Sequence, residues 1–426
     1  MSLFQRSLCM CVTLWSLAVI HAFGATSQVG TCTSFTPQFA TIQAAVTAAS
    51  SGQTIYVCPG SYPEQVAIST NLTLEGLQVG HSGLAAVTVP AGGVVVNATS
   101  LGGNPVAAQI VVTGGARVTI SDLTVDGYGN GIATCATDLV GIYFQNASGT
   151  VTESAVLNEV LPAGFTGCQS GEGIYAESGS GGTSTINVNT TTVENYQKNG
   201  ITGNSAGTTL TATNNTIVGQ GSTTGAAENG IQIGFGATGT LTSNTVTDDV
   251  WGPDTSSDAG DAAAGILVYA SSDVDIESNQ VTDTQFGIVT VSDPTLGPAD
   301  FTTIRSNSVS ATHIFDAIDV CSNHNAIESN TINVADEAGI HLDDTCGTTG
   351  NNNTATGNTV NASCAGILKG SATTGNTITD IYYNVQNVVL AGDSCTLPAS
   401  ITPGSFLKKT VKVKKTGRPK FMPLRP

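Results

Sequence analysis

The architecture of this chain can be read in one short run, Gly265-Ile266-Leu267-Val268-Tyr269, followed by Val274-Asp275-Ile276, Asn279-Gln280-Val281 and, where the pattern begins again, Gly287-Ile288. Apolar and polar residues alternate with a period of two inside these pieces, which is typical of β-strands with one buried face. Small and polar residues separate the pieces and predict sharp corners between them. The run therefore predicts three short strands and then a return to the starting position.

A small residue followed by Ile recurs at intervals of 32, 27, 30, 35, 22, 30, 22 and 27 residues, which indicates a coil of fixed size with inserted loops. The pairs are Gly141-Ile142, Gly173-Ile174, Gly200-Ile201, Gly230-Ile231, Gly265-Ile266, Gly287-Ile288, Ala317-Ile318, Gly339-Ile340 and Gly366-Ile367. One coil cannot bury its apolar face alone, whereas stacked coils share a continuous core. The repeat predicts an all-β right-handed parallel β-helix. The Leu-x-x-Leu-x-Leu pattern of leucine-rich repeats is absent from it.

A second mark follows in each coil, an Asn that stands two residues before a Val or Ile. Asn tolerates the left-handed backbone of a sharp corner, and stacked Asn side chains can hydrogen-bond from coil to coil. We expect one corner ladder formed by Asn215, Asn244, Asn279, Asn307, Asn330, Asn358 and Asn376. The Ile residues and the Val or Ile after each Asn should point into the core.

Residues 38–76 differ from the repeat. Residues 39–49 have helical apolar spacing, Ser50-Ser51-Gly52 ends it, and residues 54–58, 66–68 and 72–74 read as strands. Thr41-Ile42-Gln43-Ala44-Ala45-Val46, with the Thr54-Ile55-Tyr56-Val57 and Pro59-Gly60 that follow, resembles the N-terminal cap of pectin-lyase-like right-handed parallel β-helix proteins. The resemblance implies a bacterial extracellular protein whose short helix covers the first coil.

The chain divides into an export signal (1–24), the N-terminal cap with the first coils (25–125), the main coils (126–395) and a basic tail (396–426). The signal has Arg6 before an apolar run and small residues at its end, and no later stretch has the roughly 20 apolar residues of a membrane span. We therefore expect a secreted protein, extracellular or periplasmic. Eight cysteines remain after the signal, and disulfides are expected between neighbours in sequence: Cys32–Cys58, Cys135–Cys168, Cys321–Cys346 and Cys364–Cys395.

The charges are unevenly distributed. Residues 25–404 hold all 31 acidic residues but only four basic ones, a net charge of 4 − 31 = −27, whereas eight basic residues lie between Lys408 and Arg425. A surface this acidic repels nucleic acid, so we expect no nucleic-acid partner. The tail is expected to be disordered and to contact an anionic envelope polymer or the acidic body.

Enzymes with this fold need particular catalytic residues, and this sequence lacks most of them. Pectin methylesterases share the cap, but the stretches that carry their catalytic acids have no counterpart here. A polysaccharide lyase needs basic residues, and only Arg117, Lys198, Arg305 and Lys369 lie in the body. No cysteine–histidine cluster at metal-binding spacing is present, so no cofactor is expected. Ca2+ on Asp273, Asp275 and Glu277 stays an open alternative to a solvated strand face.

When the coils stack, the residues one and three positions after each Ile form a column of side chains on the outer surface. In this register Asp319 lies beside His341 on the next coil, and Asp343 lies diagonally from Asp319. Polygalacturonases, to which these residues are only loosely similar, use Asp and His on this face. We expect Asp343 to act as general acid and Asp319, paired with His341, to activate water. The same column contains the candidate substrate-binding residues Tyr143, Tyr175, Glu177 and Tyr269, and the three tyrosine rings are candidates for sugar stacking.

These observations favour a secreted protein that binds or processes polysaccharide, with glycoside hydrolysis as the chemistry if it is an enzyme. The alternative is a non-catalytic structural or adhesive rod, and a third reading is an ion-binding envelope protein. A groove that converges on Asp319, His341 and Asp343 would indicate an enzyme, whereas a flat Thr/Asn face would indicate a rod.

Overall fold

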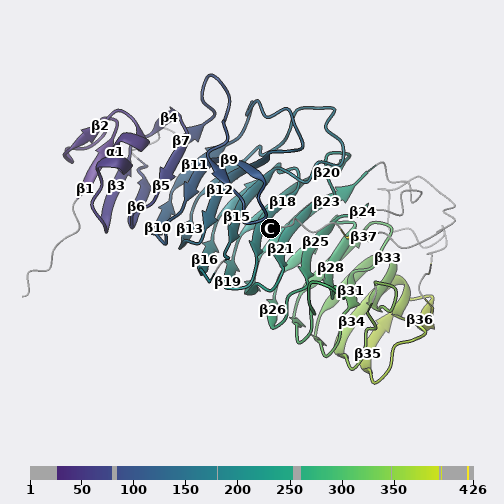
Figure 1. Ribbon diagram of the computed structural model, residues 1–426. Coiled ribbons are helices and arrows are strands. Elements are labelled where there is room, and N and C mark those ends of the chain that lie inside the picture. Colours follow the sequence, from purple (N-terminus) through teal and green to yellow (C-terminus); the bar gives the residue numbers. More distant parts are fainter. Residues whose placement is uncertain are drawn as a thin grey trace, which may run out of the picture.

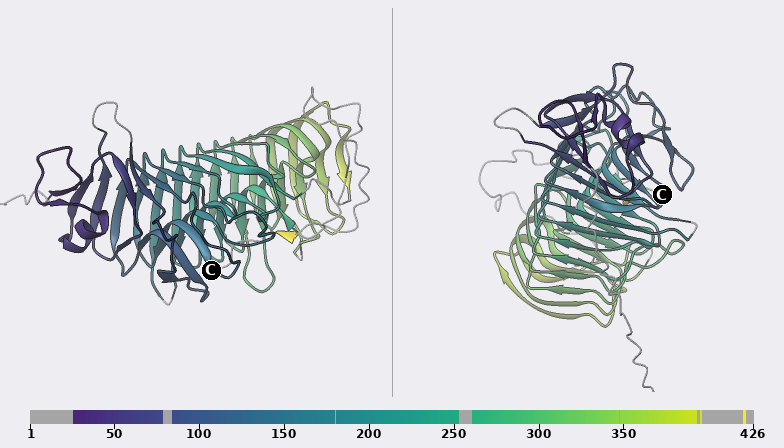
Figure 2. Two further views of the ribbon diagram at one scale, coloured as in Figure 1. Left: turned by 90° about the horizontal axis from the view of Figure 1, so that it is seen from above. Right: turned by 90° about the vertical axis from the view of Figure 1, so that its left-hand side faces the viewer.

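A computed structural model describes residues 26–78, 84–179, 181–252, 261–346, 348–392, 395 and 420–421. The chain winds into a stack of coils, each built from three short strands, and equivalent strands of successive coils pair in parallel (Figure 1). Figure 2 shows the stack from above and from its N-terminal end. The predicted right-handed parallel β-helix is confirmed.

The sheet that holds the Gly-Ile pairs is called here the Gly-Ile sheet. Its strands are β5 (Val66–Ile68), β9 (Pro105–Val112), β12 (Asp138–Gln145), β15 (Glu172–Glu177), β18 (Asn199–Asn204), β21 (Asn229–Gly234), β25 (Ala264–Tyr269), β28 (Phe286–Val291), β31 (Ile318–Cys321), the ends of β33 (Thr331–Leu342) and β34 (Thr354–Lys369), and β36 (Asn387–Ala391).

The second sheet follows the Gly-Ile sheet in each coil. Its strands are β1 (Thr26–Val29), β3 (Gln53–Val57), β6 (Leu72–Gly76), β10 (Arg117–Ser121), β13 (Ser148–Thr152), β16 (Ser184–Asn189), β19 (Thr208–Thr213), β22 (Thr238–Thr242), β26 (Val274–Glu277), β29 (Thr303–Arg305), β32 (Ala326–Glu328), the start of β34, and β35 (Thr377–Tyr383).

The third sheet completes each coil. Its strands are β4 (Gly60–Pro63), β7 (Ala85–Thr88), β11 (Leu123–Asp126), β14 (Ala155–Leu157), β17 (Thr192–Glu194), β20 (Thr216–Thr223), β23 (Thr245–Trp251), β27 (Gln280–Thr282), β30 (Ser308–Thr312), and parts of β33, β34 and β35. Short strands β2 (Gln38–Phe39) and β8 (Ala98–Thr99) pair with β1 and β9.

The core confirms the predicted register of the Gly-Ile pairs. Each Ile of the series pairs directly with the Ile of the next coil, from Ile142 to Ile367. These Ile residues are all buried in one continuous cluster with the Val and Ile residues that follow the corner asparagines. The Gly before Ile is required by packing: a Cβ at Gly230 would lie 2.3 Å from a Val246 methyl and 2.7 Å from the Gly265 carbonyl.

The first coil is covered by α1 (Ile42–Ala48), which buries Ile42, Ala45 and Val46. The Thr41 hydroxyl accepts a hydrogen bond from Ala44 N at the start of the helix, and the Glu64 carboxylate accepts from the backbone N–H groups of Ile42 and Gln43 at 2.7 and 2.8 Å. The helix begins three residues later than the apolar spacing predicts, because Thr41 caps it.

The Asn ladder is present at the corner before the third sheet, with one correction. From Asn215 to Asn358 each side-chain N–H donates to the next Asn side chain at 2.8–3.0 Å, and Asn358 donates to Asp380. Asn376 is not part of this ladder. It ends a second ladder before the second sheet, formed by Asn325, Asn353 and Asn376, because Thr377 pairs with Thr354 of that sheet.

All four predicted disulfides are formed: Cys32–Cys58, Cys135–Cys168, Cys321–Cys346 and Cys364–Cys395. The predicted export signal lies outside the described residues. So does most of the tail, except for β37 (Lys420–Phe421), which pairs in parallel with β24 (Asp261–Ala262). In the part of the chain that the structure describes, no helix is long and apolar enough to cross a membrane.

Candidate functional site

The outer face of the Gly-Ile sheet holds the candidate residues in the predicted register. Val289 of β28 pairs with Asp319 of β31, Asp319 pairs with His341 of β33, and His341 pairs with Leu368 of β34. Because Ile288, Ile318 and Ile340 point into the core, the residue after each of them lies on the outside. The placement of Asp319 next to His341 is confirmed.

Asp316, which the sequence analysis did not include, completes this group. Its Oδ2 lies 3.2 Å from His341 Nδ1, and its Oδ1 accepts a hydrogen bond from the backbone N–H of Ala338 at 3.0 Å. The other ring nitrogen, His341 Nε2, lies 4.0 Å from Asp343 Oδ1. The imidazole therefore lies between two carboxylates. We refer to Asp316, Asp319, His341 and Asp343 as the Asp/His site.

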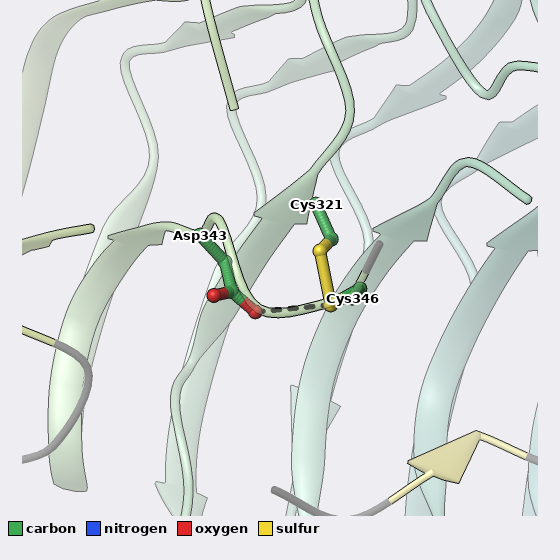
Figure 3. A group of neighbouring side chains, drawn as sticks. All are labelled: Cys321, Asp343 and Cys346. Carbon is green, nitrogen blue, oxygen red and sulfur yellow. Dashed lines mark hydrogen bonds between the residues drawn. A yellow bond between two sulfur atoms is a disulfide. The ribbon is translucent and has the colours of Figure 1, made fainter. Parts of the chain in front are cut away.

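Asp343 is oriented by the turn that follows β33. Its Oδ1 accepts hydrogen bonds from the backbone N–H and the hydroxyl of Thr345, at 2.8 and 2.9 Å. Its Oδ2 lies 3.0 Å from the sulfur of Cys346 (Figure 3). The Cys321–Cys346 disulfide anchors this turn to the preceding coil and so fixes the carboxylate beside β31.

Two groups of described residues bring metal-ligating atoms together. In the first, Cys321, Asp343 and Cys346, the two sulfurs are bonded to each other and so provide no thiolate. In the second, donor atoms of Asp316, Asp319 and His341 all lie within 4.8 Å of one another, and the three side chains are fully buried. Two carboxylates and an imidazole suit a divalent cation or proton transfer.

Two of the three tyrosines that were expected to form an exposed platform are buried. Tyr143 and Tyr175 stack with ring centroids 5.2 Å apart, but they are only 0% and 1% exposed. Both hydroxyls hydrogen-bond to Glu177, which is itself buried and accepts from the backbone N–H of Leu101. The segment around β8 covers the rings, a long-range contact that a coil register cannot predict.

Tyr269 lies further along the same face and is partly exposed. Its hydroxyl hydrogen-bonds to Asp293, and its ring contacts Phe235 with centroids 5.4 Å apart. It stays a candidate for contact with a ligand. On the second sheet, Glu277 pairs with Arg305 at 2.8 Å and Asp275 is exposed, which supports a solvated strand face there.

A second group of buried acids lies near the corner between the third sheet and the Gly-Ile sheet. Glu172, Glu228 and Asp249 are fully buried, and burial raises the pKa of each carboxyl well above its usual range. Lys198, also buried, opposes this rise by its charge and donates a hydrogen bond to the carbonyl of Ala227. Burial thus favours the neutral form of these carboxyls, and nothing in the residue spacing indicated the group.

Asp316 was missed for a definable reason. The sequence analysis assigned outward positions only to residues after each Ile. The residue before each Gly-Ile or Ala-Ile pair also lies on the outside. Val140 packs with Tyr143 and Tyr175, and Phe286 packs with Leu267 and Val289, on the outer side. Asp316 occupies this position before Ala317-Ile318, so the signal was present in the sequence.

Residues 129–295 match the family model described as periplasmic copper-binding protein (NosD). No curated protein matches the chain. The matched stretch contains no His and no Met, and its two cysteines, Cys135 and Cys168, are joined in a disulfide. Copper prefers imidazole, thiolate and thioether ligands, so the residues of this stretch do not fit a copper site.

Solved structures share the architecture. The A-modules of the mannuronan C-5 epimerases AlgE6 and AlgE4 from Azotobacter vinelandii are 15% and 13% identical, with TM-scores of 0.53 and 0.54. The alignments cover 83% and 84% of this chain and 94% and 95% of those modules. The Dettilon tailspike protein is 15% identical with a TM-score of 0.50, over 78% of this chain and 62% of that one. These likenesses show that the chain has the right-handed parallel β-helix fold of those proteins.

Proposed function

We propose that this protein binds a polysaccharide outside the cytoplasm and hydrolyses its glycosidic bonds at the Asp/His site. The observation that carries the proposal is the convergence of Asp316, Asp319, His341 and Asp343 on the outer face of one sheet. Glycoside hydrolysis needs one carboxyl that donates a proton and one carboxylate that activates water or attacks the sugar. The mannuronan C-5 epimerases named above share the fold and support a carbohydrate ligand by analogy only.

The contacts of the carboxylates suggest a division of roles that reverses the one expected from the sequence. Two hydrogen bonds from Thr345 hold the Asp343 carboxylate in a fixed orientation, so it is the candidate base. Asp316 and Asp319 have oxygens within 4.8 Å of each other, where two like charges repel and one shared proton is favoured. Asp319 is then the candidate acid, and Asp316 orients His341.

The burial of the site favours a second candidate function. All four side chains are 0% exposed, which excludes a sugar from this conformation. A non-catalytic rod would show the same buried polar residues together with the long Asn ladder. Hydrolysis therefore requires a conformational change that exposes these four side chains.

Four disulfides support an oxidising compartment for either function, because cytosolic thiols are kept reduced. The periplasmic description of the matching family model agrees with this placement. We propose an extracellular or periplasmic location, reached through the export signal expected at residues 1–24.

The test is a glycan panel assayed for new reducing ends with the full chain and with Asp319→Asn and Asp343→Asn. Loss of one catalytic carboxyl should lower the rate by about 10²–10⁴-fold. Asp275→Asn is the matched control, since Asp275 is an exposed acid on the second sheet and should leave the rate unchanged. Cleavage that survives in both site variants would exclude this site, and no cleavage of any glycan would favour the rod.

A further inference from the structure

Lys198 differs from the other basic residues of the body because its side chain is fully buried. Arg117 and Arg305 are exposed, and Lys369 is partly exposed. Burial of an ammonium group costs free energy unless its surroundings compensate for the lost water, so lysine is seldom fully buried. The groups around the Lys198 amine therefore indicate what it does.

The amine of Lys198 contacts the side chain of Asn229 on the next coil. Lys198 directly precedes β18, Asn229 begins β21, and the two strands pair side by side (Figure 1). The backbone N–H of Asn229 donates to the Lys198 carbonyl at 2.8 Å, and Lys198 Nζ donates to the Ala227 carbonyl. One terminal atom of the Asn229 amide lies 3.3 Å from Nζ, and this atom is the oxygen in the orientation that satisfies both polar atoms of the amide. An amine and a carboxamide are thus in contact.

This contact suits nucleophilic attack by the amine. The carbonyl carbon, Asn229 Cγ, is one bond away from the atom in contact, and groups held about 3–3.5 Å apart are placed for reaction. Burial disfavours the charged form of an amine, and the neutral form is the nucleophile. Asn229 is only 1% exposed, so water that would compete for the carbonyl is excluded.

Glu228, the residue before Asn229, can supply the proton that such a reaction needs. Its Oε2 accepts a hydrogen bond from the backbone N–H of Gln220 at 3.0 Å, and its buried Oε1 has no hydrogen-bond partner among the described residues. Burial and then the charge of Asp249 raise the pKa of this carboxyl well above its usual range, against the hydrogen bond from Gln220 and the charge of Lys198. A carboxyl that favours its protonated form therefore lies within electrostatic reach of the amine.

We propose that Lys198 and Asn229 become joined by an isopeptide bond in the folded protein. Lys198 Nζ attacks Asn229 Cγ, the bond from Cγ to the amide nitrogen breaks, and that nitrogen leaves as ammonia. The Glu228 carboxyl gives its proton to the leaving nitrogen and takes back the proton that the attacking nitrogen loses. No oxidant, reductant or other reactant is consumed, because the condensation releases only ammonia.

The bond is a covalent link between neighbouring coils in the middle of the stack. It closes a loop of 229 − 198 = 31 residues. Thiols, which exchange with disulfides, do not break it. None of its residues belongs to the Asp/His site, so the link does not depend on the proposed hydrolysis.

Digestion of the reduced and denatured full chain with trypsin tests the bond. Lys198 is the one basic residue between Arg117 and Arg305, so a chain without the bond gives the peptides 118–198 and 199–305. A linked Lys198 is not cleaved, and we expect a single peptide 118–305 that weighs about 17 Da less than its sequence requires, the mass of one ammonia. Release of 199–305 from most chains, or a loss of about 18 Da as water from a bond to a carboxyl instead, would overturn the proposal.

Lys198→Arg should abolish the bond, because a guanidinium stays protonated and is not a nucleophile, and trypsin should then cut after position 198. Lys369→Arg is the matched control. Lys369 is the other lysine of the body and is partly exposed, so its replacement should keep the loss of about 17 Da. The wild-type peptide decides the question by itself, even if Lys198→Arg does not fold.

Glu228→Gln tests the proton transfer. It keeps the size of the side chain and should slow bond formation by about 10²-fold or more, followed as the fraction of peptide 118–305 in pulse-labelled, newly made chain. Asp275→Asn, at an exposed acid on the second sheet, should leave this rate unchanged. An unchanged rate in Glu228→Gln, with coils shown to be intact by circular dichroism, would exclude this carboxyl from the reaction. Glycan cleavage is assayed separately on the same proteins, so failure of the bond and failure of the proposed function give different results.

Discussion

At the scale of single residues, burial of acids on the Gly-Ile sheet has a consequence for stability. Burial is the main cause that raises the pKa of Asp138 to about 6 from its usual 3.8, helped by the charge of Glu177 and opposed by a hydrogen bond from Asn104. The folded state then keeps a proton that the unfolded chain has already released. The stabilising contribution is fully present below pH 3.8 and is lost as the pH rises through 6.

Asp138→Asn should therefore weaken the pH dependence of stability. Between pH 4 and pH 7 we expect the variant to gain on the order of 3 kcal/mol relative to wild type, from a pKa difference of about two units. Urea unfolding at both pH values measures it, with Asp275→Asn on the exposed strand face as the control. A gain equal to that of the control would contradict the raised pKa.

The sequence predicted the Asp319–His341 pair because it depends only on coil register, which the repeated Ile fixes. It did not predict the burial of Tyr143 and Tyr175, because the segment of Thr99 and Leu101, which hydrogen-bonds to the neighbouring Gln145 and Glu177, is an insertion outside the repeat. The buried group around Lys198 also escaped, because Glu228 lies in the loop before β21, and Asp249 lies in β23 beyond the register shift between Val218 and Gly221. Regular strands could be predicted, and inserted loops could not.

At the scale of elements, the corner ladder is a set of fully satisfied amides. Asn279 donates to Leu241 O and to Asn307 Oδ1, and its own oxygen accepts from the backbone and side chain of Asn244. Asn376 was placed in this ladder because its local sequence, Asn-Thr-Ile, is the same. Its distance from the preceding Gly366 is only 376 − 366 = 10 residues, against 279 − 265 = 14 for Asn279, so it reaches an earlier corner.

Asn279→Ala should lower the free energy of unfolding by roughly 3 kcal/mol, because several buried hydrogen-bonding groups lose their partner at once. The matched control is Asn361→Ala. Asn361 also bonds to asparagines of both neighbouring coils, Asn333 and Asn384, but in an exposed row. We expect less than about 0.5 kcal/mol there. Equal losses of unfolding free energy in the two variants, measured by urea unfolding, would show that burial of the ladder does not determine its contribution to stability.

At the scale of the whole molecule, the protein is a stack in which each coil pairs with its two neighbours. Stability in such a stack is nearly a sum of local terms, and the ends are the weak points. The N-terminal end is closed by α1 and Cys32–Cys58, and the last coils are held by Cys364–Cys395. The disulfides thus reinforce both ends.

Replacement of both Cys364 and Cys395 by Ser should loosen the C-terminal coils selectively. Chain-entropy estimates for a loop of 31 residues give on the order of 3–4 kcal/mol. Hydrogen exchange should become faster in β34 and β36 and stay unchanged in β12 and β15. Faster exchange along the entire stack would instead indicate one cooperative unit.

The central claim is that the Asp/His site on the Gly-Ile sheet cleaves a polysaccharide. The most direct test is the rate of reducing-end release by the full chain, compared with the same protein carrying Asp319→Asn. The account predicts cleavage of at least one glycan by the first protein and a rate lower by about 10²-fold or more in the second. Equal rates in the two proteins, or no release of reducing ends by either, would contradict it.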